Sequence, residues 1–313
     1  MIGIDNVRFS EAHTEDLQTL MTGIGACGCA LLARALNDSK FDGTLSAENA
    51  AALAEFEPTA AEHIMVELLP LAARFARPPI SGFHVGAVAR GSSGRLYFGA
   101  NIEFPGQTLG ASVHAEQSAM SNAYMHGEDG ITALAVTAAP CGHCRQFLWE
   151  MCFGGELQIV MRGRSRCSLK ALLPDAFGPA DLGLKRGAFP VSRVPLELRT
   201  ENPGPLPQAA LEAAQMSWAP YSKSYAGMAV RTSRGTIYRG VSIENAAYNP
   251  TLPPAQSALA RLTASGDDPG QIVEAALVEI PEMPVSYRQA TESILAGIAP
   301  AATLTALPAV LTS

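Results

Sequence analysis

Four residues of the chain have the side chains and the spacing of a catalytic metal site. His114 and Glu116 stand in the run Val-His-Ala-Glu, and Cys141 and Cys144 stand in Pro-Cys-Gly-His-Cys. One imidazole and two thiolates suit zinc, and three protein ligands leave a fourth position open for water. Glu116 is two residues beyond the histidine, so we expect it to lie beside the metal without binding it. The pattern predicts a site that activates water for hydrolysis.

Both halves of this motif are expected at the start of a helix. Residues 111–125 have helical spacing and carry His114 and Glu116 in the first turn, and Pro140 leads into a second helix at residues 141–151. The positive end of a helix dipole favours the thiolate form of a cysteine, which is the form that binds metal. Cysteines at i and i+3 lie on the same side of a helical turn. The spacing therefore directs both sulfur atoms towards one metal.

Short strands surround these helices. Residues 83–90 and 95–102 favour β structure and are separated by Gly-Ser-Ser-Gly, which predicts a hairpin. A phosphate-binding loop is the alternative, but no Lys-Ser/Thr pair or helix follows these glycines directly. Further strands are expected at residues 131–138 and 156–161. The order strand, strand, helix, strand, helix, strand is typical of a layered α/β domain.

The bulk composition favours a protein with a small ligand. The chain has 313 residues, enough for two domains, and its 48% hydrophobic and 16% charged residues can bury a large core. The formal net charge of −7 opposes a nucleic acid partner, because polynucleotide-binding grooves are basic. Six cysteines are too few and too unevenly spaced for a disulfide scaffold. We therefore expect free thiols and a cytoplasmic location.

No segment predicts secretion or membrane insertion. The first 15 residues include acidic side chains and lack an apolar core, so no signal peptide is expected. The most apolar run, residues 26–35, is interrupted by Arg34 and is too short to span a bilayer. We therefore expect no membrane partner.

Composition divides the chain into three parts. Residues 1–68 predict an N-terminal helical segment without a chemical cluster, and residues 69–200 hold the metal motif. The run Glu-Asn-Pro-Gly-Pro-Leu-Pro then resembles a linker and opens a third part at residues 201–313. Helices of the first part are expected at residues 11–21, 26–36, 46–56 and 58–69.

The third part repeats the second. Laying residues 79–104 over residues 220–245 without a gap gives 10 identities in 26 positions, where average residue usage would give roughly one or two. The matches keep the turn glycines, and they include Glu103 with Glu244. A shift of two residues then aligns the Gln-Ser-Ala run at 117–119 with an identical run at 256–258. The chain therefore contains a duplicated fold.

The second copy has lost the metal motif. The four chemical positions become Pro253, Ala255, Pro284 and Tyr287, none of which can replace the residue that it faces. A copy that keeps its turns and loses its ligands is most simply a structural half. We therefore expect one active site and one zinc ion per chain.

Other roles for the ligand cluster fit less well. A redox Cys-x-x-Cys pair would need neither the histidine nor the glutamate, and a closed structural zinc site would need a fourth ligand. His143 is the nearest candidate, but it lies between the two cysteines and should point away from a metal that they share. The run Arg-Gly-Arg-Ser-Arg at residues 162–166 predicts either a solvated loop or a contact with an anionic substrate group or a partner subunit.

The combination His-x-Glu and Pro-Cys-x-x-Cys is the signature of zinc-dependent nucleobase deaminases. The chain resembles the cytidine deaminases in particular, of the long homodimeric type whose C-terminal copy is inactive. The similarity covers about residues 65–290 and is strongest in Gly-Phe-His-Val-Gly-Ala (82–87), Phe-Gly-Ala-Asn-Ile-Glu-Phe (98–104), Val-His-Ala-Glu-Gln-Ser-Ala (113–119) and Pro-Cys-Gly-His-Cys-Arg-Gln (140–146). It implies a three-layer α/β/α domain, duplicated in the chain, with the second copy degenerate.

The resemblance also implies a role for each site residue. His114, Cys141 and Cys144 would bind zinc, and Glu116 would carry protons between water, the ring and the departing amine.

Further positions would bind the nucleoside. The backbone N–H of Ala115 would meet the pyrimidine O2, and Asn101 and Glu103 would bind the ribose hydroxyl. Phe83 would pack on the pyrimidine ring, with Phe177 as a second aromatic partner. At position 84 the family has asparagine where this chain has histidine, so the resemblance assigns no role there.

We therefore expect a homodimeric, cytoplasmic enzyme of pyrimidine salvage that deaminates cytidine and 2′-deoxycytidine. One rival is a deaminase of tRNA or DNA, which should have a basic groove and aromatic stacking residues. A second is a deaminase of dCMP, blasticidin or guanine, against which Asn101 and Glu103 favour an unphosphorylated ribose. The rival outside enzymes is a zinc-stabilised interaction protein, for which Glu116 would be dispensable.

Overall fold

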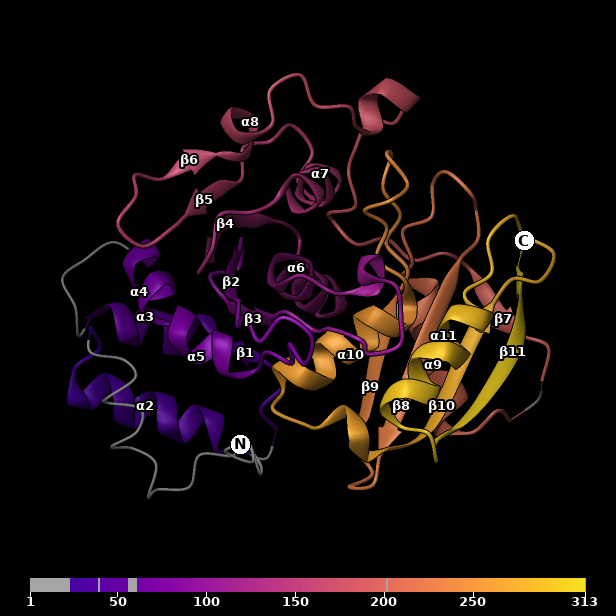
Figure 1. Cartoon of the computed structure of the whole chain (residues 1–313). Helices are drawn as coiled ribbons and strands as arrows, with labels where there is room; N and C mark the ends of the chain where they lie inside the picture. The colour runs from indigo at the N-terminus through magenta and orange to yellow at the C-terminus, as the bar shows by residue number, and fades with distance from the viewer. Residues whose placement is uncertain (1–22, 39, 56–60, 201, 313) are drawn as a thin grey trace.

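The computed structural model describes residues 23–38, 40–55, 61–200 and 202–312. Two α/β units lie side by side, and the N-terminal helices pack on the first of them (Figure 1). The helix expected at residues 11–21 lies outside the described residues. Within those residues, no helix is long and apolar enough to cross a membrane.

The first unit is built on a mixed sheet. Its strands are β1 (Thr44–Leu45), β2 (Gly86–Gly91), β3 (Leu96–Ala100), β4 (Ile131–Val136), β5 (Gln158–Val160) and β6 (Cys167–Ser168). They lie in the order β1-β3-β2-β4-β5-β6, with β4 and β5 parallel and the other pairs antiparallel. The predicted hairpin is confirmed, because β2 and β3 pair antiparallel. The turn between them contains Gly94 at a φ of 85°, a conformation that favours glycine. The edge strand β1 was not predicted.

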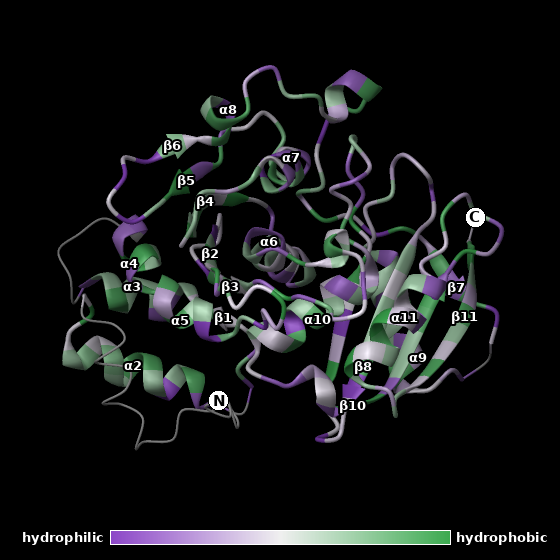
Figure 2. Ribbon diagram, in the orientation of Figure 1, coloured by the Kyte–Doolittle hydropathy of each residue, from purple (hydrophilic) through white to green (hydrophobic). Residues whose placement is uncertain are grey.

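Helices cover both faces of this sheet. On one face lie α2 (Ala26–Leu36), α3 (Ala47–Glu55), α4 (Ala61–Glu67) and α5 (Leu69–Arg74), and on the other lie α6 (Ala115–Met125) and α7 (Gly142–Met151). Val88 and Phe98 of the strands pack towards α2–α5, whereas Ala87 and Tyr97 pack towards α6 and α7. This alternation confirms three layers. In Figure 2 most of α2 is green, the colour of hydrophobic residues, in agreement with the side chains that it buries in the core beside the sheet.

The helix predicted at residues 58–69 corresponds to α4, which ends at Glu67. A separate helix, α5, begins at Leu69 with Pro70 in its first turn and continues to Arg74. Proline has no N–H to continue the hydrogen-bond ladder of α4, whereas the first turn of a new helix does not need that donor.

The second unit repeats this arrangement. Its elements are β7 (Leu196–Leu198), α9 (Pro205–Gln215), β8 (Ala226–Thr232), β9 (Ile237–Val241), α10 (Pro254–Ala264), β10 (Ile272–Glu279), α11 (Arg288–Ile298) and β11 (Thr303–Leu311). The strand order β9-β8-β10-β11 matches β3-β2-β4-β5, including one parallel pair in each sheet. The strand β7 joins this sheet beside β11, ahead of the predicted linker.

Two pairs of glycines fix the equivalence of the copies. A Cβ at Gly99 would lie 2.2 Å from the backbone nitrogen of Ala119 on α6, and one at Gly240 would lie 2.0 Å from that of Ala258 on α10. Gly86 and Gly227 approach α5 and α9 in the same way. Each helix can lie this close to its sheet only where the strand has no side chain. The internal repeat seen in the sequence is therefore a repeat of the fold.

The two units share one hydrophobic core. Residues of α6 and α7 and residues of α10 and α11 belong to a single buried cluster. Within it the hydroxyls of Ser121 and Ser257 lie 2.7 Å apart, so α6 and α10 meet directly. The second unit is therefore packed against the α6–α7 layer of the first unit.

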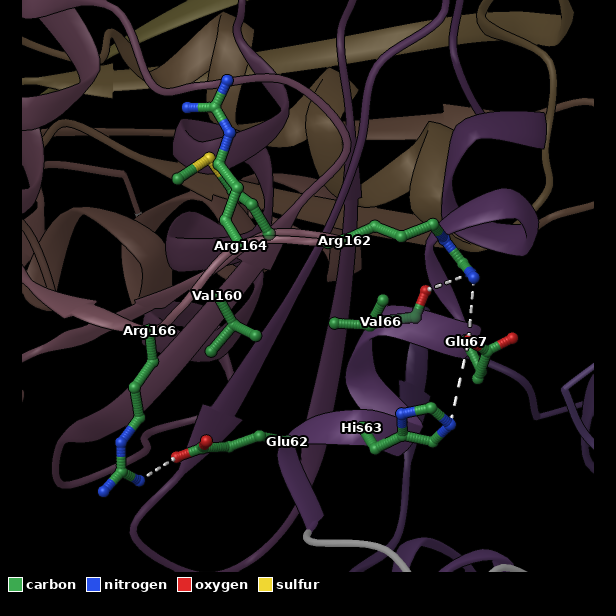
Figure 3. Close-up of a pocket in the computed structure, with 10 residues that line it drawn as sticks. Glu62, His63, Val66, Glu67, Val160, Arg162, Arg164 and Arg166 are labelled. Atoms are coloured by element: carbon green, nitrogen blue, oxygen red, sulfur yellow. Dashed lines mark hydrogen bonds and ion pairs between the residues drawn. The ribbon is translucent and has the colours of Figure 1, made fainter.

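The basic run holds α4 against the first sheet. In the groove of about 340 Å³ shown in Figure 3, Arg162 lies 2.9 Å from the carboxylate of Glu67, and Arg166 lies 3.0 Å from that of Glu62. Arg164 points away from both pairs (Figure 3). Two of the three arginines therefore contact carboxylates of the same chain.

Candidate active site

The first ligand stands just outside its helix. His114 is the N-cap of α6 in an extended conformation, and its backbone N–H donates to the side-chain oxygen of Gln117 at 3.2 Å. Val113 forms a bridge with Ile102 beside β3, which keeps the chain extended up to the cap. The helix was expected from residue 111, but it begins at Ala115. Glu116 thus remains in the first turn of α6, whereas His114 lies one residue before the helix begins.

The two thiols lie at the start of α7. Cys141 is the N-cap residue, and Cys144 is buried one turn further on. The predicted helix therefore begins one residue later than expected, and both sulfurs lie at its N-terminal end. All six cysteines are free thiols.

The structure brings the three predicted ligands together. The His114 Nδ1 lies 3.2 Å from the Cys144 Sγ and 3.5 Å from the Cys141 Sγ, and the three ligand atoms lie within 4.8 Å of one another. Zinc with its usual bond lengths would place nitrogen and sulfur about 3.6 Å apart in a tetrahedron. Nitrogen with two sulfurs is also the donor set that zinc prefers, so the site fits this metal. The ring of His143 lies 5.7 Å from that of His114, and His143 does not belong to the cluster.

The two thiols are electrostatically unequal. A hydrogen bond from Cys144 lowers the pKa of Cys141 to about 4 against the effect of burial, and backbone N–H groups and His114 act in the same direction. The pKa of Cys144 is raised because it is the donor of this bond and is also buried. One thiolate therefore already exists at neutral pH, which suits the binding of a dication.

Glu116 is the buried acid of the site. Its side chain is 4% exposed, and burial raises the pKa of its carboxyl, although its own backbone N–H, His114 and Cys144 oppose the shift. A carboxyl whose pKa is moved towards neutrality can both accept and deliver a proton at physiological pH. The arrangement can therefore support general acid–base chemistry beside a metal.

Asn101 and Glu103 brace one loop. The amide of Asn101 accepts from the Val85 N–H and donates to the Phe83 carbonyl, both at 2.9 Å. The carboxylate of Glu103 accepts from two successive backbone N–H groups and from the Ser81 hydroxyl. The sequence did not reveal this bracing, because its partners lie on another part of the chain. Both side chains thus shape the loop that presents Phe83.

Two aromatic side chains project into solvent. Phe83 is 62% exposed and Phe177 is 47% exposed. The carbonyl of Phe177 accepts a 2.7 Å hydrogen bond from the side chain of Gln146 on α7. This bond connects the segment around Phe177 to the helix that carries Cys144. Ala115 is fully buried at the first position of α6, where a helix leaves its N–H groups without internal acceptors.

The second copy keeps part of this framework. Glu244 accepts from the backbone N–H groups of Tyr221 and Ser222 and from the Ser222 hydroxyl, as Glu103 does in the first copy. Among the residues that the structure describes, His114, Cys141 and Cys144 are the one group of three or more side chains that could hold a metal.

Comparisons with known proteins agree with this site. Two models described as the cytidine and deoxycytidylate deaminase zinc-binding region match residues 58–157 and 169–292. The first match contains all four chemical residues, and the second falls on the zinc-free copy. Because both models describe a zinc-binding region and the donor set fits, zinc is the metal of this site.

Similar proteins of known name extend over most of the chain. The chain is 44% identical to a cytidine deaminase of Vibrio atlanticus over 87% of its own length and 91% of that protein. It is 42% identical to a cytidine deaminase of Aliivibrio fischeri over 85% and 89% of the two lengths. A solved cytidine deaminase of Mycobacterium tuberculosis matches 38% of this chain and 99% of its own, with 34% identity and a TM-score of 0.36. Identity of this extent, together with the zinc-binding region, places the chain in the cytidine deaminase family.

Proposed function

We propose that the chain catalyses the hydrolytic deamination of cytidine and 2′-deoxycytidine to uridine and 2′-deoxyuridine, with release of ammonia, in pyrimidine salvage. The observation that carries this proposal is the buried carboxyl of Glu116 beside the cluster of His114, Cys141 and Cys144. That combination provides three metal ligands and one proton carrier within a single site. Its deaminase relatives make a cytosine ring the natural substrate.

Glu116 moves the protons of the reaction. His114, Cys141 and Cys144 would hold one zinc ion, which when bound makes hydroxide available near neutral pH. Glu116 takes one proton from the water and passes it to N3 of the ring. It then takes the proton of the hydroxyl formed at C4 and delivers it to the amine at C4. The oxygen of water becomes O4 of the product, the C4–N bond breaks, and ammonia leaves. The raised pKa of Glu116 suits a group that must accept and release a proton in one cycle.

The remaining site residues would hold the nucleoside. The free N–H at the start of α6, on Ala115, is suited to the pyrimidine O2. Phe83 and Phe177 offer exposed rings for contact with the base. The Glu103 carboxylate would accept a hydrogen bond from the ribose 3′-hydroxyl and the Asn101 amide would donate one to it, while both side chains brace their loop.

Charge supports a nucleoside rather than a nucleotide or a nucleic acid. Burial would raise the pKa of Glu103, but the Ser81 hydroxyl and two backbone N–H groups outweigh it and lower this pKa, so the carboxylate is charged at neutral pH and would repel a phosphate. The net charge of −7 also disfavours a polynucleotide. A deaminase of dCMP, blasticidin, guanine or nucleic acid is therefore the weaker alternative, as is a zinc-stabilised interaction protein.

The proposal includes a cytoplasmic homodimer. The exposed rings of Phe83 and Phe177 are apolar surface that a second chain could cover. Light scattering of the purified protein would measure its mass, and a monomer would remove this part of the proposal.

A panel of substrates tests the function. The purified zinc-loaded protein is incubated with cytidine, 2′-deoxycytidine, dCMP, adenosine and guanine, and ammonia release is followed. We expect release from the first two alone, at one zinc per chain, and none from cytidine with the Glu116→Ala variant. If cytidine stays intact while another compound reacts, the substrate assignment is wrong. If none reacts although zinc is bound, the chain is not a deaminase of these rings.

A further inference from the structure

A buried carboxylate on α7, the helix that carries Cys144, has no part in the proposed chemistry. Glu150 lies on α7, six residues after Cys144, and its side chain is fully buried. It points towards the second copy rather than towards the ligand cluster. A buried carboxylate is costly unless it is fully hydrogen-bonded.

The second copy supplies the hydrogen-bond donors. The indole N–H of Trp218 donates to Glu150 at 2.7 Å, the Tyr221 hydroxyl at 2.8 Å and the backbone N–H of Ala246 at 2.9 Å. Burial raises the pKa of the Glu150 carboxyl, and these three hydrogen bonds oppose that shift. Removing the acceptor would leave buried donors unpaired. The three donors therefore form a specific socket for one side chain of the catalytic copy.

This socket is itself rigid. Trp218 is bridged to Ile243, its carbonyl accepts from the Glu244 N–H at 2.8 Å, and the Glu244 carboxylate in turn accepts from the Tyr221 N–H at 2.9 Å. Arg186 also covers the ring of Trp218 at 4.8 Å. Glu244, which the second copy shares with the first, thus fixes the segment that carries Tyr221.

A second contact lies one turn closer to the ligands. The side chain of Asn245 donates to the Gln146 carbonyl at 3.0 Å, and Gln146 donates to Phe177. The second copy thus contacts α7 at Gln146 and again at Glu150. Two contacts one turn apart limit both the rotation and the sliding of a helix.

The placement of α7 decides whether the ligand set is complete. His114 belongs to α6 and the two thiols belong to α7, so the nitrogen–sulfur distances of 3.2 and 3.5 Å depend on how these helices lie. Zinc–nitrogen and zinc–sulfur bonds have well-defined lengths, so one ion can bind all three side chains only while the two helices keep this relative position. A helix fixed on its far side against a second domain retains this geometry between turnovers.

We propose that Glu150 is a positioning residue, through which the zinc-free copy holds α7 so that Cys141 and Cys144 stay in register with His114. The inference rests on the zinc site of the proposed function and gives the second copy a role in it. Glu150 touches neither metal nor substrate. Its effect passes through the helix.

The test is the release of zinc from a conservative variant. In Glu150→Gln the side-chain oxygen can still accept from Trp218 and Tyr221, but the new amide group faces the N–H of Ala246. We expect the full-length, zinc-loaded variant to release zinc to a coloured chelator roughly tenfold faster than the wild type, the low end of the effect of outer-shell substitutions on zinc affinity. Zinc release at the wild-type rate would overturn the proposal.

A matched variant separates positioning from stability. Asp267 is also a buried carboxylate, and it accepts from the Tyr238 hydroxyl at 2.6 Å and from Arg234 at 3.0 Å within the second copy. Asp267→Asn should lower the melting temperature and leave zinc release unchanged. If both variants release zinc equally fast at equal loss of stability, Glu150 is merely structural and the proposal fails.

A milder variant covers the case in which Glu150→Gln does not fold. Trp218→Phe keeps an aromatic ring under Arg186 and removes a single donor. We expect a smaller acceleration of zinc release, with no change counting against the proposal. Because zinc release needs no substrate, its outcome is independent of whether cytidine is deaminated.

Discussion

Glu103 and Glu244 make the same three hydrogen bonds in the two copies of the fold. Each carboxylate accepts from a serine hydroxyl, of Ser81 or Ser222, and from two successive backbone N–H groups. The second copy has no metal ligands, yet it has kept this contact. The bracing therefore belongs to the fold, and any contact with ribose would be an addition in the first copy.

This relationship predicts different effects for two matched variants. Glu103→Gln should raise the KM for cytidine about tenfold, because one hydrogen bond to a charged group contributes about 1.5 kcal/mol. Glu244→Gln should weaken the same bracing and leave the KM within about twofold. Steady-state kinetics at neutral pH measures both. An equal rise in KM for the two variants would show that Glu103 acts only through its loop.

Glu116→Gln should separate chemistry from metal binding. Since Glu116 is beside the ligands and not among them, the variant should keep one zinc per chain while kcat falls about 10²- to 10⁴-fold, the usual contribution of a general acid–base group. Elemental analysis and ammonia release provide the two readouts. Loss of zinc in parallel with activity would instead make Glu116 part of the metal site.

The two close glycines provide a second matched pair. Gly99→Ala would drive a methyl group into the backbone of α6, and Gly240→Ala would do the same to α10. Each should cost about 3 kcal/mol of unfolding free energy, the upper range for overpacking. Only Gly99→Ala should also weaken zinc binding, because α6 follows His114 and carries Glu116. Zinc affinity measured at a temperature where both variants are folded tests this, and equal weakening would contradict it.

Acid should weaken the contact between the N-terminal segment and α6. Burial raises the pKa of Asp42, but the hydrogen bond and charge of His126, at 2.8 Å, outweigh it and lower the pKa to about 2. A carboxyl whose pKa is lower in the folded state stabilises the fold above its unfolded value, about 3.9, and loses this effect as the pH falls towards 2. Because the Asp42 side chain is 46% exposed, we expect no more than about 1 kcal/mol.

Urea unfolding of the wild type and of Asp42→Asn measures this contribution. The difference in unfolding free energy should be largest near pH 5 and should shrink between pH 4 and pH 2. A difference that stays constant throughout this range would show that the ion pair is not its source.

Local residue patterns were sufficient to predict the ligand set and the internal repeat. Cys141 and Cys144 could be paired because their spacing places both sulfurs at one helix turn, and His114 could be added because the His-x-Glu run is the other half of the same zinc motif. The aligned glycines also predicted two copies of the fold. Each glycine stands where a helix lies so close to a strand that no side chain fits between them. Such features depend on residues that are close together in the chain, so they are visible in the amino-acid sequence.

Tertiary structure decided the partners across the chain. Nothing near Glu150 predicts that Trp218 and Ala246 would satisfy its carboxylate, nor does the basic run predict that Arg162 would pair with Glu67. The edge strand β1 was missed likewise, because two residues carry no periodicity and pair only once β3 is in place. Such contacts join groups that are far apart in the sequence, so they depend on which segments the fold brings together.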